Sequence, residues 1–167
     1  MTAMITPEPP RSPEQRLRDT LGRLRDDQDA WVATASPDGI PCLVPLWFAW
    51  NGATLLMATR RTNPTAVNVT PTGEIRVTLG TPRDVVLIKG EAEIVEGTAL
   101  PTDDGDAFAA KLGWDPRKSA PCVYLRITPH TVQAWREENE QAGRDLMRSG
   151  TWLAGPSSPG RSAVLPS

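Results

Sequence analysis

Two adjacent arginines before a predicted helix start are the strongest candidates for chemistry in this sequence. Arg60 and Arg61 lie within the segment MATRRTNPTAVNVT, where Thr62 or Asn63 is suited to cap a helix and Pro64 to occupy its first position. The first N–H groups of a helix lack intrahelical partners, and guanidinium groups donate bidentate hydrogen bonds to phosphate. The pattern predicts a phosphate-binding site. The alternative is that both arginines belong to a solvated turn.

Other catalytic chemistry has few candidate residues. The single histidine, His130, follows Pro129 at a predicted turn, so a histidine-based metal site or a Ser-His-Asp triad would depend on it alone. Cys42 and Cys122 each lie beside a proline in an apolar stretch, which predicts buried structural thiols. We therefore expect no metal site. The sequence also lacks GxxxxGK[ST] and GxGxxG motifs, which mark nucleotide-triphosphate and Rossmann sites.

The aromatic residues are dominated by tryptophan, with 6 Trp against 2 Phe and 1 Tyr. Flat aromatic surfaces can stack on a ring cofactor, and Trp47 and Trp50 lie on the strand that precedes Asn51-Gly52. Packing in the core or at a subunit contact is the favoured interpretation for any single tryptophan.

Alternating apolar and polar residues predict a β-meander from Trp31 onward. A Pro-Asp-Gly turn follows the first strand, and Asn51-Gly52 predicts a type I′ hairpin turn because both central positions of that turn need positive φ. Gly90 is expected to allow a bend or a close backbone approach. The predicted strand segments are WVATAS, IPCLVPLWFAW, ATLLMAT, EIRVTLG, VVLIKGEAEIVE and CVYLRITPHTVQAW, the last being a strand pair interrupted at Pro129. About six strands with few helices indicate a barrel or a sandwich.

Helices are predicted at three places, one of them at Pro64. The segment SPEQRLRDTLGRLRDD begins with Ser12 as N-cap, Pro13 at the first helical position and Gln15 at the capping-box position. Its leucines share one face, which predicts an amphipathic helix. A short helix is predicted over FAAKLGW.

Length and charge favour one small domain that does not bind nucleic acid. The 167 residues are consistent with a single domain over 13–153, and the Pro- and Ser-rich segments 1–12 and 154–167 predict disordered tails. A net charge of −2 argues against nucleic acid as a partner. No apolar run is long enough to cross a bilayer, and prolines replace the apolar core of a signal peptide, so we expect a cytoplasmic protein.

The succession from Trp31 to Trp135 resembles the split-barrel flavoproteins related to pyridoxamine 5′-phosphate oxidase, including actinobacterial members that bind FMN or the deazaflavin coenzyme F420. The shared order is strand, Asp-Gly turn, strand through a proline, hairpin, strand, then basic residues entering a helix. The resemblance implies a mostly β fold, a six-stranded antiparallel split β-barrel with a few flanking short helices, and a homodimer with the cofactor at the subunit interface.

The resemblance also implies site residues. Those expected to border the isoalloxazine ring are Pro45, Leu46 and Trp47, and those expected to bind the phosphate are Thr59, Arg60, Arg61, Thr62 and Asn63, with Lys89 as a weaker candidate. Family members often have a lysine where this sequence has Pro64-Thr65, which leaves the longer deazaflavin coenzyme open beside FMN.

Three functions remain open at this point. The first is an FMN-dependent or deazaflavin-dependent oxidoreductase that passes a hydride to a small organic acceptor. The second is a non-catalytic flavin-binding or carrier protein, and the third is a barrel without a ligand. Oxidation of pyridoxamine 5′-phosphate itself is disfavoured, because the sequence has no match to the family's C-terminal arginine-histidine segment.

Overall fold

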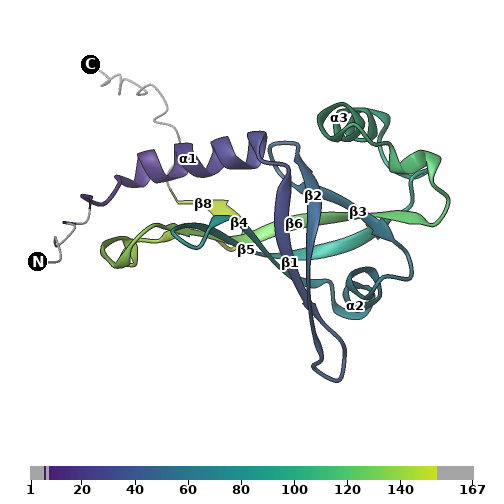
Figure 1. Ribbon diagram of the computed structural model, residues 1–167, viewed down its shortest axis with the longest axis horizontal. Helices are drawn as coiled ribbons and strands as arrows, with labels where there is room; N and C mark the ends of the chain where they lie inside the picture. The colour runs from purple at the N-terminus through teal and green to yellow at the C-terminus, as the bar shows by residue number, and fades with distance from the viewer. Residues whose placement is uncertain (1–5, 7, 154–167) are drawn as a thin grey trace, which may run out of the picture.

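The chain folds into a closed six-stranded antiparallel barrel, as expected (Figure 1). The computed structural model describes residue 6 and residues 8–153. The barrel strands follow the order β3-β2-β1-β4-β5-β6, and pairing of β6 with β3 closes the barrel. They are β1 (Asp29–Ala35), β2 (Pro41–Trp50), β3 (Leu55–Arg60), β4 (Glu74–Thr81), β5 (Asp84–Val95) and β6 (Cys122–Trp135). A hairpin that the sequence patterns did not predict, β7 (Asp145–Arg148) and β8 (Thr151–Trp152), adds to β6.

Helix α1 (Pro13–Asp26) forms where the leucine spacing predicts it and lies along one side of the barrel (Figure 1). The Ser12 hydroxyl accepts a hydrogen bond from the backbone N–H of Gln15 at 3.1 Å, which confirms Ser12 as the N-cap. The buried residues of α1 include Leu17 and Leu24, so the predicted apolar face is the packed one.

Helix α2 (Pro64–Thr72) begins after Asn63, as predicted. Helix α3 (Thr102–Leu112) begins six residues before the predicted segment FAAKLGW, because acidic residues stabilise its first turn and Gly113 ends it with a φ of 68°. Two short 3₁₀ helices, η1 (Pro116–Lys118) and η2 (Glu138–Glu140), flank β6. No helix in the described ranges is long and apolar enough to span a membrane.

The hairpin between β2 and β3 lies at the predicted place but has a different turn. Trp50 pairs with Leu55, so the loop has four residues rather than two. Gly52 has a φ of 95°, whereas Asn51 has no positive φ, which excludes type I′. The Asn51 side-chain oxygen instead accepts hydrogen bonds from the N–H groups of Ala53 and Thr54 at 3.0 and 2.8 Å. These bonds hold the longer loop.

Strand β6 runs through Pro129 as one strand, so the predicted interruption there is wrong. Lys89 pairs with Thr131 and Gly90 with Pro129, which leaves His130 as the extra residue of a β-bulge. A proline has no backbone N–H to donate to the neighbouring strand. At the bulge the regular hydrogen-bond pattern is interrupted, so Pro129 is tolerated there. The predicted close approach at Gly90 is confirmed, because a Cβ there would lie 2.7 Å from the Thr128 carbonyl oxygen.

The core fills the barrel interior and extends under two helices. The main cluster includes Leu24 of α1 together with Val32, Phe48, Ile88 and Leu125 of the strands. A second cluster lies under α3, where the Phe108 and Tyr124 rings meet edge to face at 5.5 Å between centroids. Burial of these side chains fixes which strand positions face outward.

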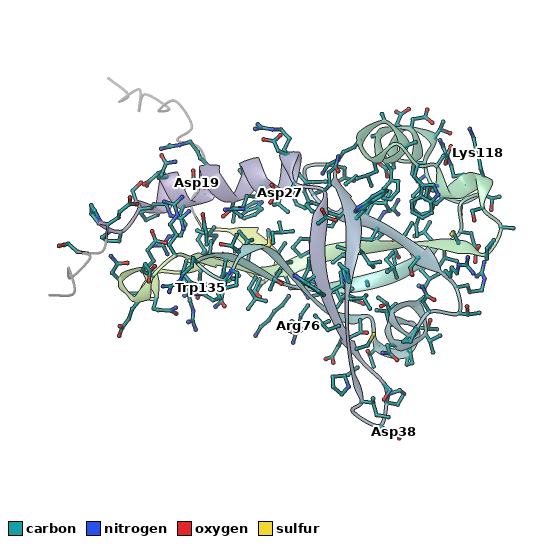
Figure 2. All side chains as sticks on the ribbon, in the orientation of Figure 1. Asp19, Asp27, Asp38, Arg76, Lys118 and Trp135 are labelled. Atoms are coloured by element: carbon teal, nitrogen blue, oxygen red, sulfur yellow. The ribbon has the colours of Figure 1, made fainter. Side chains whose placement is uncertain are left out.

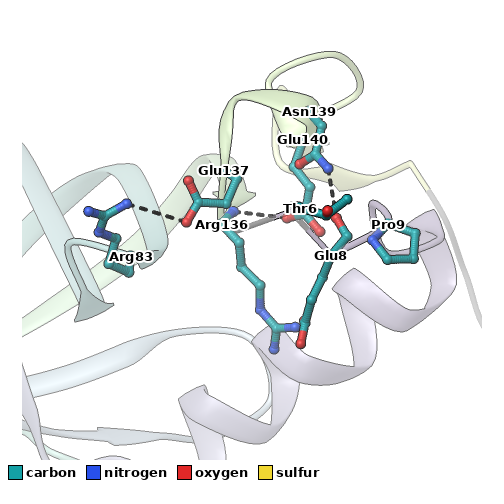
Figure 3. A pocket seen from close by; sticks show the side chains of 8 residues that line it. All are labelled: Thr6, Glu8, Pro9, Arg83, Arg136, Glu137, Asn139 and Glu140. Atoms are coloured by element: carbon teal, nitrogen blue, oxygen red, sulfur yellow. Dashed lines mark hydrogen bonds and ion pairs between the residues drawn. The ribbon is translucent and has the colours of Figure 1, made fainter. Parts of the chain in front are cut away.

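A buried carboxylate joins the start of α1 to the segment after β6. Glu140 is 2% exposed and accepts hydrogen bonds from the Arg11 guanidinium at 3.0 and 2.8 Å, and from the backbone N–H groups of Arg11 and Arg136 at 2.9 Å. These contacts hold the pKa of Glu140 at about 2. Arg11 is thus anchored, although it lies in the segment 1–12 that was expected to be a disordered tail. The other expected tail residues 1–5, 7 and 154–167 lie outside the described part of the chain. Figure 3 shows Glu140 beside a cavity of about 480 Å³.

Candidate functional site

An exposed apolar surface covers the outer side of β1 and β2. Trp31 is 51% exposed, Leu43 63% and Trp47 44%. Pro45 is also exposed and lies opposite Trp31 in the β1–β2 ladder. We call these four residues the apolar face. Side chains of this size and exposure on one sheet surface are typical of a binding surface.

Two of the three residues expected at the flavin ring belong to this face. Pro45 and Trp47 are exposed, whereas Leu46 between them is half-buried and packs against the barrel core. The alternation of a strand causes this division, because neighbouring side chains point to opposite sides. Leu46 is therefore placed to support the strand rather than to contact a ligand on the outer side.

The expected phosphate site lies where β3 enters α2. Thr59 is buried, and its hydroxyl accepts a hydrogen bond from the Asn63 side-chain amide at 2.8 Å. The Asn63 side chain consequently makes no capping bond to α2, although Asn63 is the N-cap residue. The first N–H groups of α2 thus lack a side-chain cap, which suits an anion. Thr62 is exposed at the same turn.

The two arginines differ in their contacts. Arg61 forms a bidentate ion pair with Glu96, with nitrogen–oxygen distances of 2.5 and 2.8 Å. This contact raises the pKa of Arg61 and lowers that of Glu96. The Arg60 side chain is exposed and has no hydrogen bond or ion pair within the described residues. Arg60 is therefore the arginine available to a ligand, while Arg61 would have to leave Glu96.

The apolar face and the start of α2 flank the place where β2 and β3 separate. The β2–β3 ladder ends at the pair Phe48 and Met57, so the strand residues beyond it share no ladder bonds. Helix α2 packs against β1, β2 and β3 at this end of the barrel. The ring residues expected on β2 and the phosphate residues expected after β3 therefore lie on the two sides of this separation.

Lys89 lies away from this region. It pairs with Arg76 on β4 and with Thr131 near one end of β6, whereas Arg60 pairs with Cys122 at the other end of β6. The structure therefore does not bring Lys89 to the start of α2. The β4–β5 register places Lys89 opposite Arg76, a residue that the sequence had not singled out. Figure 2 labels Arg76 on the ribbon. The outward position of Arg76 follows from the alternation in EIRVTLG, but its partner requires the strand register.

The remaining candidates form no reactive cluster. His130 is half exposed, and its Nε2 lies 3.9 Å from a carboxylate oxygen of Glu91. Both cysteines are free, and they are half-buried rather than fully buried as expected. Each lies close to a surface turn or a helix start. Cys42 Sγ is 3.9 Å from the Thr65 hydroxyl, and Cys122 Sγ is 3.5 Å from the Ser119 hydroxyl. Within residues 8–153, no three His, Cys, Asp or Glu side chains gather in a way that could hold a metal ion.

Comparison with known proteins identifies relatives of this fold. A family model described as pyridoxamine 5′-phosphate oxidase matches residues 21–136. Among curated proteins, no sequence matches the chain.

Solved structures share the architecture at low sequence identity. An F420 reductase is 22% identical over 66% of this chain and 93% of its own, with a TM-score of 0.53. A conserved hypothetical protein from Mycobacterium tuberculosis is 19% identical over 73% of this chain and 85% of its own, with a TM-score of 0.61. General stress protein 26 from Bacillus anthracis is 19% identical over 74% of this chain and 96% of its own, with a TM-score of 0.53. These likenesses concern the fold.

Proposed function

The chain belongs to the pyridoxamine 5′-phosphate oxidase family, and from this premise we propose that it is an FMN-binding oxidoreductase that passes a hydride to a small organic acceptor. One observation carries the proposal. An exposed apolar face lies at the same end of the barrel as the start of α2, where Asn63 makes no side-chain capping bond, and as Arg60, whose side chain has no ion-pair partner among the described residues. FMN combines a flat ring with a phosphate, so its two chemical parts match these two surfaces.

The residues present are suited to such a cofactor. Arg60 and the first N–H groups of α2 would hold the phosphate, because both donate hydrogen bonds and carry positive charge. Pro45 and Trp47 would contact the ring through apolar surface, and Thr59 would position Asn63 through the bond between their side chains. When bound, FMN supplies hydride transfer, while the protein supplies binding and orientation. A site without a catalytic triad is consistent with that division.

The exposure of the apolar face supports a homodimer as part of this proposal. Trp31, Leu43 and Trp47 lie open on an outer surface, so a flat ring resting there would have protein on one side only. A second copy of the chain would provide the other wall and remove the apolar face from water. Substitution of Leu43 by Glu should therefore produce a monomer that sediments as a species of 18.1 kDa. A wild-type protein that is itself monomeric at micromolar concentration would refute the dimer.

Coenzyme F420 is the second candidate cofactor. Two observations favour it: the similarity to the solved F420 reductase, and Pro64-Thr65 at the position where family members that bind FMN often carry a lysine. The coenzyme shares a flat tricyclic ring and a phosphate with FMN, so the same residues would bind its core. Only a direct comparison of the two ligands separates them.

The experiment measures affinities for FMN, riboflavin and coenzyme F420 in the wild type and in Arg60→Ala, Arg61→Ala and Arg18→Ala variants. Arg18 is exposed on α1 and serves as the matched control. Loss of one charge-assisted hydrogen bond, roughly 1.5–3 kcal/mol, predicts at least tenfold weaker binding of the phosphorylated cofactor to Arg60→Ala. Arg61→Ala should lose less, because Glu96 already occupies its guanidinium.

Riboflavin, which lacks the phosphate, provides the internal control. Its affinity should be the same in all four proteins. The ligand that binds more tightly to the wild type and loses more in Arg60→Ala is the cofactor, and turnover with NAD(P)H or reduced F420 then separates an enzyme from a carrier. Equal affinity of wild type and Arg60→Ala for both phosphorylated ligands would exclude the start of α2 as the phosphate site.

A further inference from the structure

Two cations, Arg76 and Lys89, face each other on the outer surface of the barrel. Arg76 of β4 lies directly opposite Lys89 of β5, and both side chains are exposed. Within the described residues, neither forms an ion pair, and the only side-chain hydrogen bond of Arg76 is to the carbonyl of Ile75 at 3.1 Å. Like charges directly opposite on neighbouring strands are destabilising. An anion between them would turn this repulsion into attraction.

The same place is hollowed and bordered by further polar groups. A cavity of about 400 Å³ is lined by Arg76, Lys89, Thr131 and His130, by the pair Glu74 and Glu91, and by the backbone turn that includes Gly73. The β-bulge brings His130 into this lining, since it is the residue left without a ladder partner. Thr131 lies opposite Lys89 and adds a hydroxyl donor. The two glutamates face each other and lie beyond ion-pair distance of both cations.

A second cavity continues toward β1. It measures about 240 Å³, and its lining includes Arg76 and Glu74 together with Ala33 of β1. Ala33 pairs with Arg76 on one side and with Leu43 on the other, so these three side chains form a row across β2, β1 and β4. At about 4.8 Å between strands, Leu43 lies roughly 10 Å from Arg76. Arg76 is therefore close enough to the apolar face for one small molecule to contact both.

We propose that Arg76 and Lys89 bind the anionic group of the organic acceptor, a carboxylate or a phosphate, while the acceptor's apolar body extends over Ala33 toward Leu43. This inference rests on the proposed function for the identity of the ligand as an acceptor. The expected substrates are organic anions with an apolar or flat body. The strand spacing sets the length of that body at about 10 Å. Lys89 then serves the substrate and not the cofactor phosphate.

The single histidine gives a local probe of this site. In untagged, cofactor-free protein at pH 8 and constant ionic strength, inorganic phosphate and succinate are titrated while the proton resonances of the His130 imidazole are recorded by NMR. We expect saturable shifts in the wild type. The Arg76→Gln/Lys89→Gln variant should bind phosphate at least tenfold more weakly. A charge-matched Arg83→Gln/Lys118→Gln variant, which changes exposed cations elsewhere, should bind as the wild type does. Equal binding by Arg76→Gln/Lys89→Gln and the wild type would overturn the site.

Two further measurements distinguish the other possible occupants. FMN affinity should be the same in the wild type and in Arg76→Gln/Lys89→Gln, and phosphate should still shift the His130 resonances of FMN-saturated protein. Weaker FMN binding by the variant, together with competition between FMN and phosphate, would assign the pair to the cofactor and refute the proposal. Loss of a wild-type dimer in the variant would assign it to a subunit contact and also refute it. If the wild type binds no FMN or F420, the proposed function fails while the phosphate titration still tests the anion site.

Discussion

Replacement of the buried Glu140 by Gln tests how the start of α1 is held. In the folded protein the Arg11 guanidinium and two backbone N–H groups stabilise the carboxylate and lower its pKa from 4.5 to about 2. A carboxyl group with a depressed pKa contributes stability above its unfolded pKa and loses that contribution as the pH falls through the folded value. The difference corresponds to about 3 kcal/mol at pH 7, of which less than half remains at about pH 3.

We therefore expect Glu140→Gln to lower the free energy of unfolding by about 3 kcal/mol or more at pH 7. Arg16 is then buried without an ion-pair partner among the described residues, and Arg11 keeps only Asp19 and Asp84. The difference between variant and wild type should shrink as the pH falls from 4.5 to 2. Urea denaturation followed by tryptophan fluorescence at pH 7, 5 and 3 measures both effects. Glu137→Gln is the matched control: its ion pair with Arg83 is exposed, and it should change stability by less than about 0.5 kcal/mol. A Glu140→Gln variant with the pH dependence of the wild type would refute this account.

Two other substitutions test the packing of the barrel. Gly90→Ala should destabilise the protein by about 1–3 kcal/mol in urea denaturation, since the new Cβ would meet the Thr128 carbonyl oxygen; unchanged stability would mean that the bulge can relax. Lys111→Met should raise stability at pH 7, because the Lys111 ammonium is buried 4.4 Å above the Phe48 ring without a hydrogen-bond partner in the described residues. Burial lowers the pKa of Lys111, so wild-type stability should rise as the pH approaches 10.5, and the variant should lack this rise. Lower stability of the Lys111→Met variant at pH 7 would show that the contact with the ring dominates.

The sequence predicted the barrel because its patterns are local. Strand alternation, the cap at Ser12 and the Pro64 helix start each depend on residues a few positions apart, and all three are found in the structure. Turn positions were also predictable, although the Asn51 side chain selected a longer loop than the Asn-Gly pair suggests. The short hairpin of β7 and β8 has too few residues to show a period.

The candidate site depended on strand register, which the sequence does not reveal. Arg60 and Arg61 are equivalent in the sequence, but Glu96, 35 positions away, pairs with Arg61 alone. Lys89 and Arg76 meet because β4 and β5 pair in one particular register, and the bulge opposite Lys89 then adds His130. A one-residue change in pairing moves a side chain to the other face of a sheet, so neither contact could be predicted from residue types.

Closure of the barrel by β3 and β6 also has a consequence for how the chain folds. Residues Leu55–Arg60 pair with Cys122–Ile127, so the closing ladder joins segments that are made at very different times during synthesis. The meander of β1, β2 and β3 can form early from neighbouring residues, but the free edge of β3 stays unpaired until β6 has emerged. Contacts between distant segments slow folding, and an unpaired edge is a site for aggregation. We expect chains that end before residue 122 to expose this edge and to aggregate on release from the ribosome.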